Sequence, residues 1–135
     1  MLQRSLLSLL LSVAVLSCHK STGPDRGLLG TWRLETVSGQ RLPYILEEDA
    51  SRKVELTGET VTLLAAGRQI MVTSFRVTDN GSVSTEEVPA PGNYTVDGST
   101  LLLTFDDDTD TYTAIVNGDT MSIDDIGLTF VYRRD

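Results

Sequence analysis

The chain of 135 residues contains one cysteine and one histidine, and this scarcity excludes several kinds of site. A single cysteine cannot form an internal disulfide or a metal site with several cysteine ligands. With His19 as the lone histidine, neither a Ser-His-Asp triad nor a histidine-rich zinc centre is expected. The motifs G-x-S-x-G, H-E-x-x-H and C-x-x-C are absent, as is a glycine-rich phosphate loop. We therefore expect neither an enzyme nor a cofactor.

Basic residues are few as well, with 11 Lys and Arg against 19 Asp and Glu, for a net charge of −8. A protein that binds nucleic acid neutralises phosphates with basic side chains, so no nucleic-acid partner is expected. The acids are unevenly placed, because eleven of them lie between Val77 and Tyr132, where there is no Lys or Arg. Charged patches select protein partners and speed their association. One interpretation is therefore an accessory subunit that presents an acidic face to a protein partner.

The first eighteen residues have the pattern of an export signal. Arg4 supplies a positive charge, and Leu6–Leu16 is an apolar run of eleven residues. This length is normal for the core of a signal peptide, and it is too short to span a bilayer. The run stops at Cys18, after which the chain becomes polar.

The stretch VLSC at residues 15–18 resembles the bacterial lipobox, in which signal peptidase II cuts before a cysteine that then carries the lipid. Ser17 fits the small residue immediately before the cut. Leu16, one residue earlier, departs from the small residue that is often found at that position. The resemblance implies that residues 1–17 are removed and that Cys18 is the lipid attachment site. The other interpretation is a chance cysteine beside an ordinary secretory cleavage site.

The lipobox resemblance also implies a location. Several acyl chains on Cys18 would hold the protein on a membrane without spanning it. His19 does not match the aspartate that commonly retains such lipoproteins in the inner membrane. We therefore expect a bacterial cell-envelope protein, lipid-anchored in the outer membrane and facing the periplasm. Residues 18–27 are polar and rich in Gly and Pro, so they are expected to form a flexible tether.

From Leu28 onward, apolar residues recur with a period of two, which is typical of half-buried strands. Faces of this kind run through Trp32 and Leu34, Val54 and Leu56, Val61 to Ala65, Met71 to Val77, Leu101 to Phe105, Tyr112 to Val116, Met121 and Ile123, and Leu128 to Tyr132. Turn signals between them are Gly58-Glu59, Gly67-Arg68, Asn80-Gly81, Asp97-Gly98 and Asn117-Gly118. Only residues 43–51 fit a helical turn. The pattern predicts an all-β fold of about 8–10 short antiparallel strands. A small up-and-down barrel is the simplest way to hide the strand edges, and a sandwich is the alternative.

The run LGTWRL at residues 29–34 resembles the G-x-W opening of the first strand in lipocalins and bacterial lipocalin-like domains. Residues 38–44, 92–103 and 128–134 are similar to stretches of small lipocalin-like lipoproteins. The resemblance implies a lipocalin-like β-barrel over residues 28–135. It also implies a barrel-closing motif of Gly30, Trp32 and Arg133, in which an arginine of the last strand covers the tryptophan. Arg134 is the alternative for that arginine.

The sharpest acidic cluster is Asp106, Asp108 and Asp110, whose D-x-D-x-D spacing opens like a calcium-binding loop. Thr111 stands where that loop needs glycine, and Asn117 stands where it needs the closing glutamate. A weak cation site is therefore the most that this cluster predicts. The other interpretation is a solvated hairpin loop.

The interior of the barrel determines what the protein can bind. We expect large side chains to fill most of it, with at most a shallow pocket at the mouth. A cavity of about 300 Å³ or more would instead favour a ligand. The function predicted from the sequence is a non-catalytic envelope lipoprotein, membrane-anchored through its lipid, that binds a small hydrophobic ligand. The accessory subunit remains the alternative.

Overall fold

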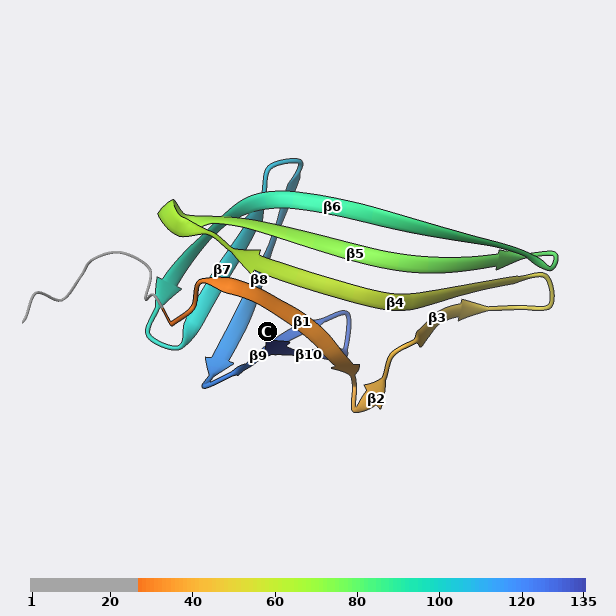
Figure 1. Ribbon diagram of the computed structural model, residues 1–135, viewed down its shortest axis with the longest axis horizontal. Helices are drawn as coiled ribbons and strands as arrows, with labels where there is room; N and C mark the ends of the chain where they lie inside the picture. The colour runs from red at the N-terminus through yellow and green to blue at the C-terminus, as the bar shows by residue number, and fades with distance from the viewer. Residues whose placement is uncertain (1–26) are drawn as a thin grey trace, which may run out of the picture.

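The computed structural model describes residues 27–135, and strands make up most of this part of the chain (Figure 1). The export signal, Cys18 and the tether before Gly27 lie outside the described residues. No helix in residues 27–135 is long and apolar enough to cross a membrane. The described elements are β1 (Gly30–Val37), β2 (Gln40–Arg41), β3 (Tyr44–Glu48), β4 (Arg52–Leu63), the 3-10 turn η1 (Ala65–Gly67), β5 (Arg68–Asp79), β6 (Ser82–Asp97), β7 (Thr100–Phe105), β8 (Asp108–Asn117), β9 (Thr120–Asp125) and β10 (Leu128–Arg134).

Eight of these strands close into a ring. Each strand from β4 to β10 pairs antiparallel with the next one along the chain. Strand β1 completes the ring by pairing with β10 on one side and with β4 on the other. The short strands β2 and β3 are attached outside the ring, to β1 and β4 respectively. The prediction of an all-β antiparallel up-and-down barrel is thus confirmed, and the sandwich is excluded because the ring has no open edge.

Most of the predicted turns lie where the sequence places them. Asn80 and Gly81 both have positive φ, as a two-residue hairpin turn requires, and they join β5 to β6. Asp97-Gly98 and Asn117-Gly118 likewise connect β6 to β7 and β8 to β9.

Two local predictions are wrong. Gly58-Glu59 is not a turn but lies inside β4, where the pairing with β5 shifts register between Leu56 and Gly58. A glycine within a strand pattern often marks such a β-bulge. Residues 43–51 hold β3 rather than a helical turn, because pairing with β4 satisfies their backbone groups. The turn that follows β3 is closed by Asp49, whose carboxylate accepts the backbone N–H groups of Ser51 and Arg52 at 2.8 Å each.

Strands β4, β5 and β6 are longer than the others and continue past the ring as a ribbon, to which β3 adds (Figure 1). On one face of this ribbon, Arg76 Nε donates to the Glu55 carboxylate at 2.7 Å, and Lys53 Nζ lies 3.3 Å from it. The hydrogen bond from Arg76 is the main reason that the pKa of Glu55 falls to about 2. These contacts tie β4 to β5 where the ribbon has left the barrel.

Strand β6 passes from the ribbon into the ring at Gly92, the first residue that pairs with β7. The two backbones approach so closely here that a Cβ on Gly92 would lie 1.8 Å from the carbonyl oxygen of Thr104. Before this point β5 is the only strand that pairs with β6 in the described chain. The Pro91 carbonyl accepts the backbone N–H of Asp106 at 3.0 Å, so the free strand edge covers residues 82–90. Pro89 lies on that edge, where a residue without an N–H blocks further strand pairing.

The hydrophobic core lies at the end of the barrel where β1 meets β4. Its centre is Trp32, which is fully buried and donates its indole N–H to the carbonyl of Leu28 at 3.1 Å. Side chains from the surrounding strands pack with it in one buried cluster that includes Val61, Leu63, Leu101, Leu103 and Met121. These side chains fill the barrel at this end and close it.

Candidate functional site

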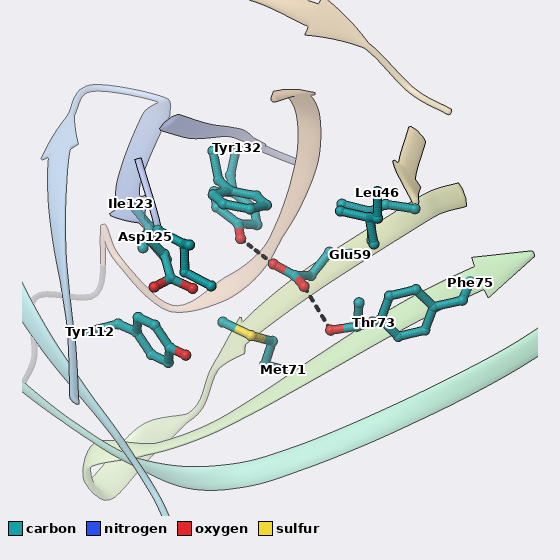
Figure 2. A pocket seen from close by; sticks show the side chains of 12 residues that line it. Leu46, Glu59, Met71, Thr73, Phe75, Tyr112, Ile123, Asp125 and Tyr132 are labelled. Carbon is teal, nitrogen blue, oxygen red and sulfur yellow. Dashed lines mark hydrogen bonds between the residues drawn. The ribbon is translucent and has the colours of Figure 1, made fainter. Parts of the chain in front are cut away.

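The other end of the barrel holds a pocket of about 370 Å³, which we call the mouth pocket (Figure 2). This volume lies within the range of small-molecule sites, roughly 300–1,000 Å³. Side chains therefore fill the barrel at its closed end but leave the mouth open. Twelve residues line the mouth pocket, and most of them are apolar or aromatic: Leu46, Leu56, Glu59, Met71, Thr73, Phe75, Tyr112, Ile123, Asp125, Ile126, Phe130 and Tyr132.

The polar centre of the mouth pocket is the carboxylate of Glu59 on β4. The Tyr132 hydroxyl, from β10, donates to one oxygen of this carboxylate. The Thr73 hydroxyl, from β5, donates to the other oxygen at 2.6 Å. Figure 2 shows Glu59 between these two partners. Three strands therefore hold one carboxylate in a fixed position.

The β-bulge in β4 explains why Glu59 faces the interior. Leu56 and Glu59 are three positions apart, so an uninterrupted strand would direct them to opposite faces. The register shift between Leu56 and Gly58 adds one residue to β4, and both side chains consequently line the mouth pocket. Sequence reasoning missed Glu59 because it interpreted Gly58-Glu59 as a turn. The signal that could have found it is the glycine inside a run of strand residues.

Two tyrosines line the mouth pocket, and both have raised pKa values. Burial is the largest cause for Tyr132, whose pKa lies well above its usual value, and the negative charge of Glu59 adds to it. Burial also comes first for Tyr112, followed by the charge of Asp125. Both phenols therefore stay protonated at neutral pH and can donate hydrogen bonds.

The mouth pocket is negatively charged. Glu59 and Asp125 both line it, and none of its twelve residues is a lysine or arginine. Four arginines of the described chain are engaged elsewhere with carboxylates: Arg33 with Asp135, Arg68 with Asp106, Arg76 with Glu55 and Arg133 with Glu35. The Glu59 carboxylate is thus stabilised by two neutral hydroxyls rather than by a cation.

The rim of the mouth pocket is apolar and exposed. Ile126, in the turn between β9 and β10, is 91% exposed, and Leu46 of β3 is 44% exposed. Ile126 also has a positive φ of 51°, a conformation that a β-branched residue rarely adopts. These two side chains extend the apolar lining of the mouth pocket to the solvent.

A second hollow, of about 480 Å³, lies on β8 and β9 and is larger than the mouth pocket. Its lining is mainly polar, with Asp110, Asp124 and Asp125 beside threonines. It therefore lacks the apolar walls that enclose a small organic ligand.

Comparison with known proteins identifies the family. The lipocalin-like domain family matches residues 28–123. The chain belongs to the lipocalin-like domain family. Among solved structures, it is similar to Echinococcus granulosus fatty-acid-binding protein 1, with 16% sequence identity and a TM-score of 0.35. That alignment covers 80% of this chain and 97% of the other. No curated protein matches the chain.

In the barrel-closing motif of this lipocalin-like domain, Trp32 lies at the closed end as expected, but the arginine that covers it is Arg134 rather than Arg133. The guanidinium of Arg134 lies 5.8 Å from the centroid of the Trp32 ring. Arg134 also donates to the backbone carbonyls of Gly27 and Leu29. Arg133, the arginine that the resemblance implies for this role, pairs instead with Glu35 at 2.9 Å on the outer surface. The correction follows from strand alternation, since Tyr132 points inward and Arg133 consequently points outward.

Gly30, the other member of that motif, begins β1 with a φ of 124°, which favours glycine. Its position lets β1 start directly opposite Leu63 of β4.

The structure does not bring Asp106, Asp108 and Asp110 together as a cation site. Asp106 forms a salt bridge with Arg68 at 2.9 Å, and this contact lowers its pKa. The Asp108 carboxylate accepts the backbone N–H of Asp110 at 3.0 Å. In residues 27–135, no group of three His, Cys, Asp or Glu side chains is placed to hold a metal ion. The geometry matches the hairpin-loop interpretation.

Proposed function

We propose that this lipocalin-like domain binds a small hydrophobic or amphipathic ligand in the mouth pocket, without catalysing a reaction. The observation that carries the proposal is an apolar pocket of about 370 Å³ with exposed Ile126 and Leu46 at its rim. A few fixed polar groups over apolar walls are the usual composition of a ligand site. The volume of the mouth pocket exceeds about 300 Å³, the lower end of the range for small-molecule sites. A barrel that served only as an interaction module would be filled by its own side chains. The volume therefore favours the ligand over the accessory-subunit alternative.

The proposal is tested by filling the mouth pocket. Met71 lines it, whereas the neighbouring Ile70 of β5 points to the opposite face and is 38% exposed. We expect Met71→Trp to weaken binding of the neutral dye N-phenyl-1-naphthylamine at least about tenfold, because the indole occupies the dye's space. Ile70→Trp adds the same side chain outside the pocket, so it should bind the dye like the wild type.

The measurement is a fluorescence titration of the dye against the purified domain, with circular dichroism to confirm that both variants fold. Wild-type protein that fails to enhance the dye's fluorescence would contradict ligand binding. Equal dye affinity in Met71→Trp and Ile70→Trp would place the site elsewhere.

We further propose that the domain is an outer-membrane lipoprotein attached through Cys18 and facing the periplasm. Support comes from the apolar run of residues 6–16 and the lipobox-like VLSC at residues 15–18. In this arrangement the lipid holds the chain on the membrane, and the barrel is displayed beside it.

The anchor is tested in bacterial cells that express the full chain. Cys18→Ala is expected to move the protein from the membrane fraction to the soluble fraction and to abolish labelling by radioactive palmitate. Ser21→Ala, which changes a nearby residue and keeps the cysteine, should leave both properties intact. Full membrane retention of Cys18→Ala would disprove lipid anchoring.

A further inference from the structure

The mouth pocket holds a carboxylate without a compensating positive charge. Glu59 is half-buried and receives hydrogen bonds from Tyr132 and Thr73, and none of the residues that line the mouth pocket is a lysine or an arginine. Removing a charge from water is costly unless an opposite charge or enough hydrogen bonds compensate. The bound ligand is therefore the natural source of the missing cation.

We propose that the ligand is an organic cation with an apolar body, and that Glu59 selects it by binding its ammonium group. This inference rests on the proposed function, because it names the class of ligand that the mouth pocket takes. A fatty acid or another anionic amphiphile is the class that the pocket excludes.

The geometry leaves Glu59 free to make such a contact. An ionised carboxylate has about four lone-pair positions, and the Tyr132 and Thr73 hydroxyls occupy one on each oxygen. An ammonium group entering from the mouth can use the remaining positions in charge-assisted hydrogen bonds. The two hydroxyls keep the carboxylate in place, so little side-chain entropy is lost when the ligand binds.

Asp125 adds to the selection for a positive charge. It lines the same pocket from the end of β9, and Figure 2 shows it beside Tyr112. Burial is the main cause of the raised pKa values of Tyr112 and Tyr132, and the negative charges of Glu59 and Asp125 add to it for both tyrosines. A ligand carboxylate would meet these two charges with the same sign of charge.

The walls of the mouth pocket suit the rest of such a ligand. Phe75 and Phe130 present aromatic rings, and Met71 and Leu56 add aliphatic surface. An aromatic face attracts a cation and also packs against apolar groups. The same wall can therefore contact both the ammonium group and the apolar body of the ligand. Two kinds of molecule carry an ammonium group on an apolar body: amines with a lipid chain and compact soluble amines. The proposal covers both kinds.

The test compares three ligands with the same ten-carbon chain: decylamine, decanol and decanoate. Binding to the purified domain is measured by calorimetry at pH 7 and about 0.15 M salt, where long-range charge effects are screened. We expect decylamine to bind at least about tenfold more tightly than decanoate, with decanol between them. Adamantylamine, a compact amine, is measured alongside to distinguish a soluble cation from a chain-bearing one.

Two variants assign the preference to the pocket. Glu59→Gln should reduce the ratio of decylamine to decanoate affinity by about tenfold, because the charge is lost while the shape is kept. Asp125→Asn removes the second charge without touching the hydrogen bonds of Glu59, and it should reduce the ratio by a smaller factor. Asp97→Asn, at the exposed end of β6, changes the net charge equally and should leave the ratio unchanged.

The outcomes separate this inference from the proposed function. If decanol and the neutral dye bind but decanoate binds as well as decylamine, the cation preference is wrong and the ligand pocket stands. An unchanged ratio in both Glu59→Gln and Asp125→Asn also overturns the preference. If none of the ligands nor the dye binds, the pocket itself is not a ligand site.

Discussion

Replacing Gly92 with alanine is expected to destabilise the barrel by more than about 3 kcal/mol, a loss typical of severe backbone conflicts. The added Cβ would lie 1.8 Å from the Thr104 carbonyl oxygen and 2.8 Å from the Phe105 Cα. Both are backbone atoms of β7, so no side chain can rotate away to relieve the overlap. The strands β6 and β7 must separate at the point where the ribbon enters the ring, and the pairing of Gly92 with Phe105 is lost.

The measurement for Gly92→Ala is the free energy of unfolding from a urea titration of the purified domain. Gly58→Ala is the matched control, because its Cβ would meet only the Ser74 side chain at 3.9 Å, an ordinary contact. Its free energy of unfolding should stay within about 1 kcal/mol of the wild type. Similar stabilities of the two variants would show that β6 and β7 are farther apart than the structure has them.

The second large effect is expected at the closed end, where Trp32→Ala should cost about 3–5 kcal/mol. Trp32 is fully buried, its N–H is bonded to Leu28, and Arg134 covers its ring. The substitution leaves a cavity among side chains from several strands, and it removes the surface on which Arg134 rests. Because a ring of strands is rigid, the surrounding structure can close this cavity only in part.

Urea unfolding again provides the measurement for Trp32→Ala. Trp32→Phe keeps an aromatic ring and should lose clearly less stability than the alanine variant. Where Trp32→Ala is still folded, its affinity for N-phenyl-1-naphthylamine should remain within about twofold of wild type, since the mouth pocket lies at the opposite end. A loss of less than about 1 kcal/mol in Trp32→Ala would show that this residue is not the centre of the core.

The overall fold follows from the sequence because alternation of apolar residues is a local property that survives in each strand. Trp32 and Leu34 alternate with Arg33 and Glu35 and are buried in the barrel. Leu101 and Leu103 are buried as well, whereas Leu102 between them points outward and is exposed. Turn pairs such as Asn80-Gly81 determine where the chain reverses. Closing the ring is then the simplest way to pair the outermost strands.

The mouth pocket could not be predicted in the same way. Its polar centre depends on one extra residue in β4, which reverses the direction of every side chain between the bulge and the turn. Simple alternation from Leu56 places Glu59 on the outer face. Wall residues such as Met71, Phe75 and Tyr112 lie on faces that alternation predicts, whereas Leu46 and Ile126 lie on none of these faces. Which residues surround a space depends on packing between distant strands.

Choosing between Arg133 and Arg134 depends on a similar difference of one residue. Both follow Tyr132 at the end of β10, and alternation from the buried Tyr132 places Arg134, not Arg133, on the side of Trp32. The acidic cluster at Asp106 is a related case, since its partner Arg68 is distant along the chain and reaches it only in the folded barrel.

The position of β1 between β4 and β10 has a consequence for the order of folding. The hairpins from β4 to β10 join neighbouring segments through short connections, so they can form early. Strand β1 and strand β10 are farther apart along the chain than any other pair of neighbouring strands in the ring, so bringing them together carries the largest loop-closure entropy. Ring closure is therefore expected to be a late step on the folding pathway. Phe130 and Tyr132 of β10 form part of the mouth pocket, so the pocket arises only when the ring is complete.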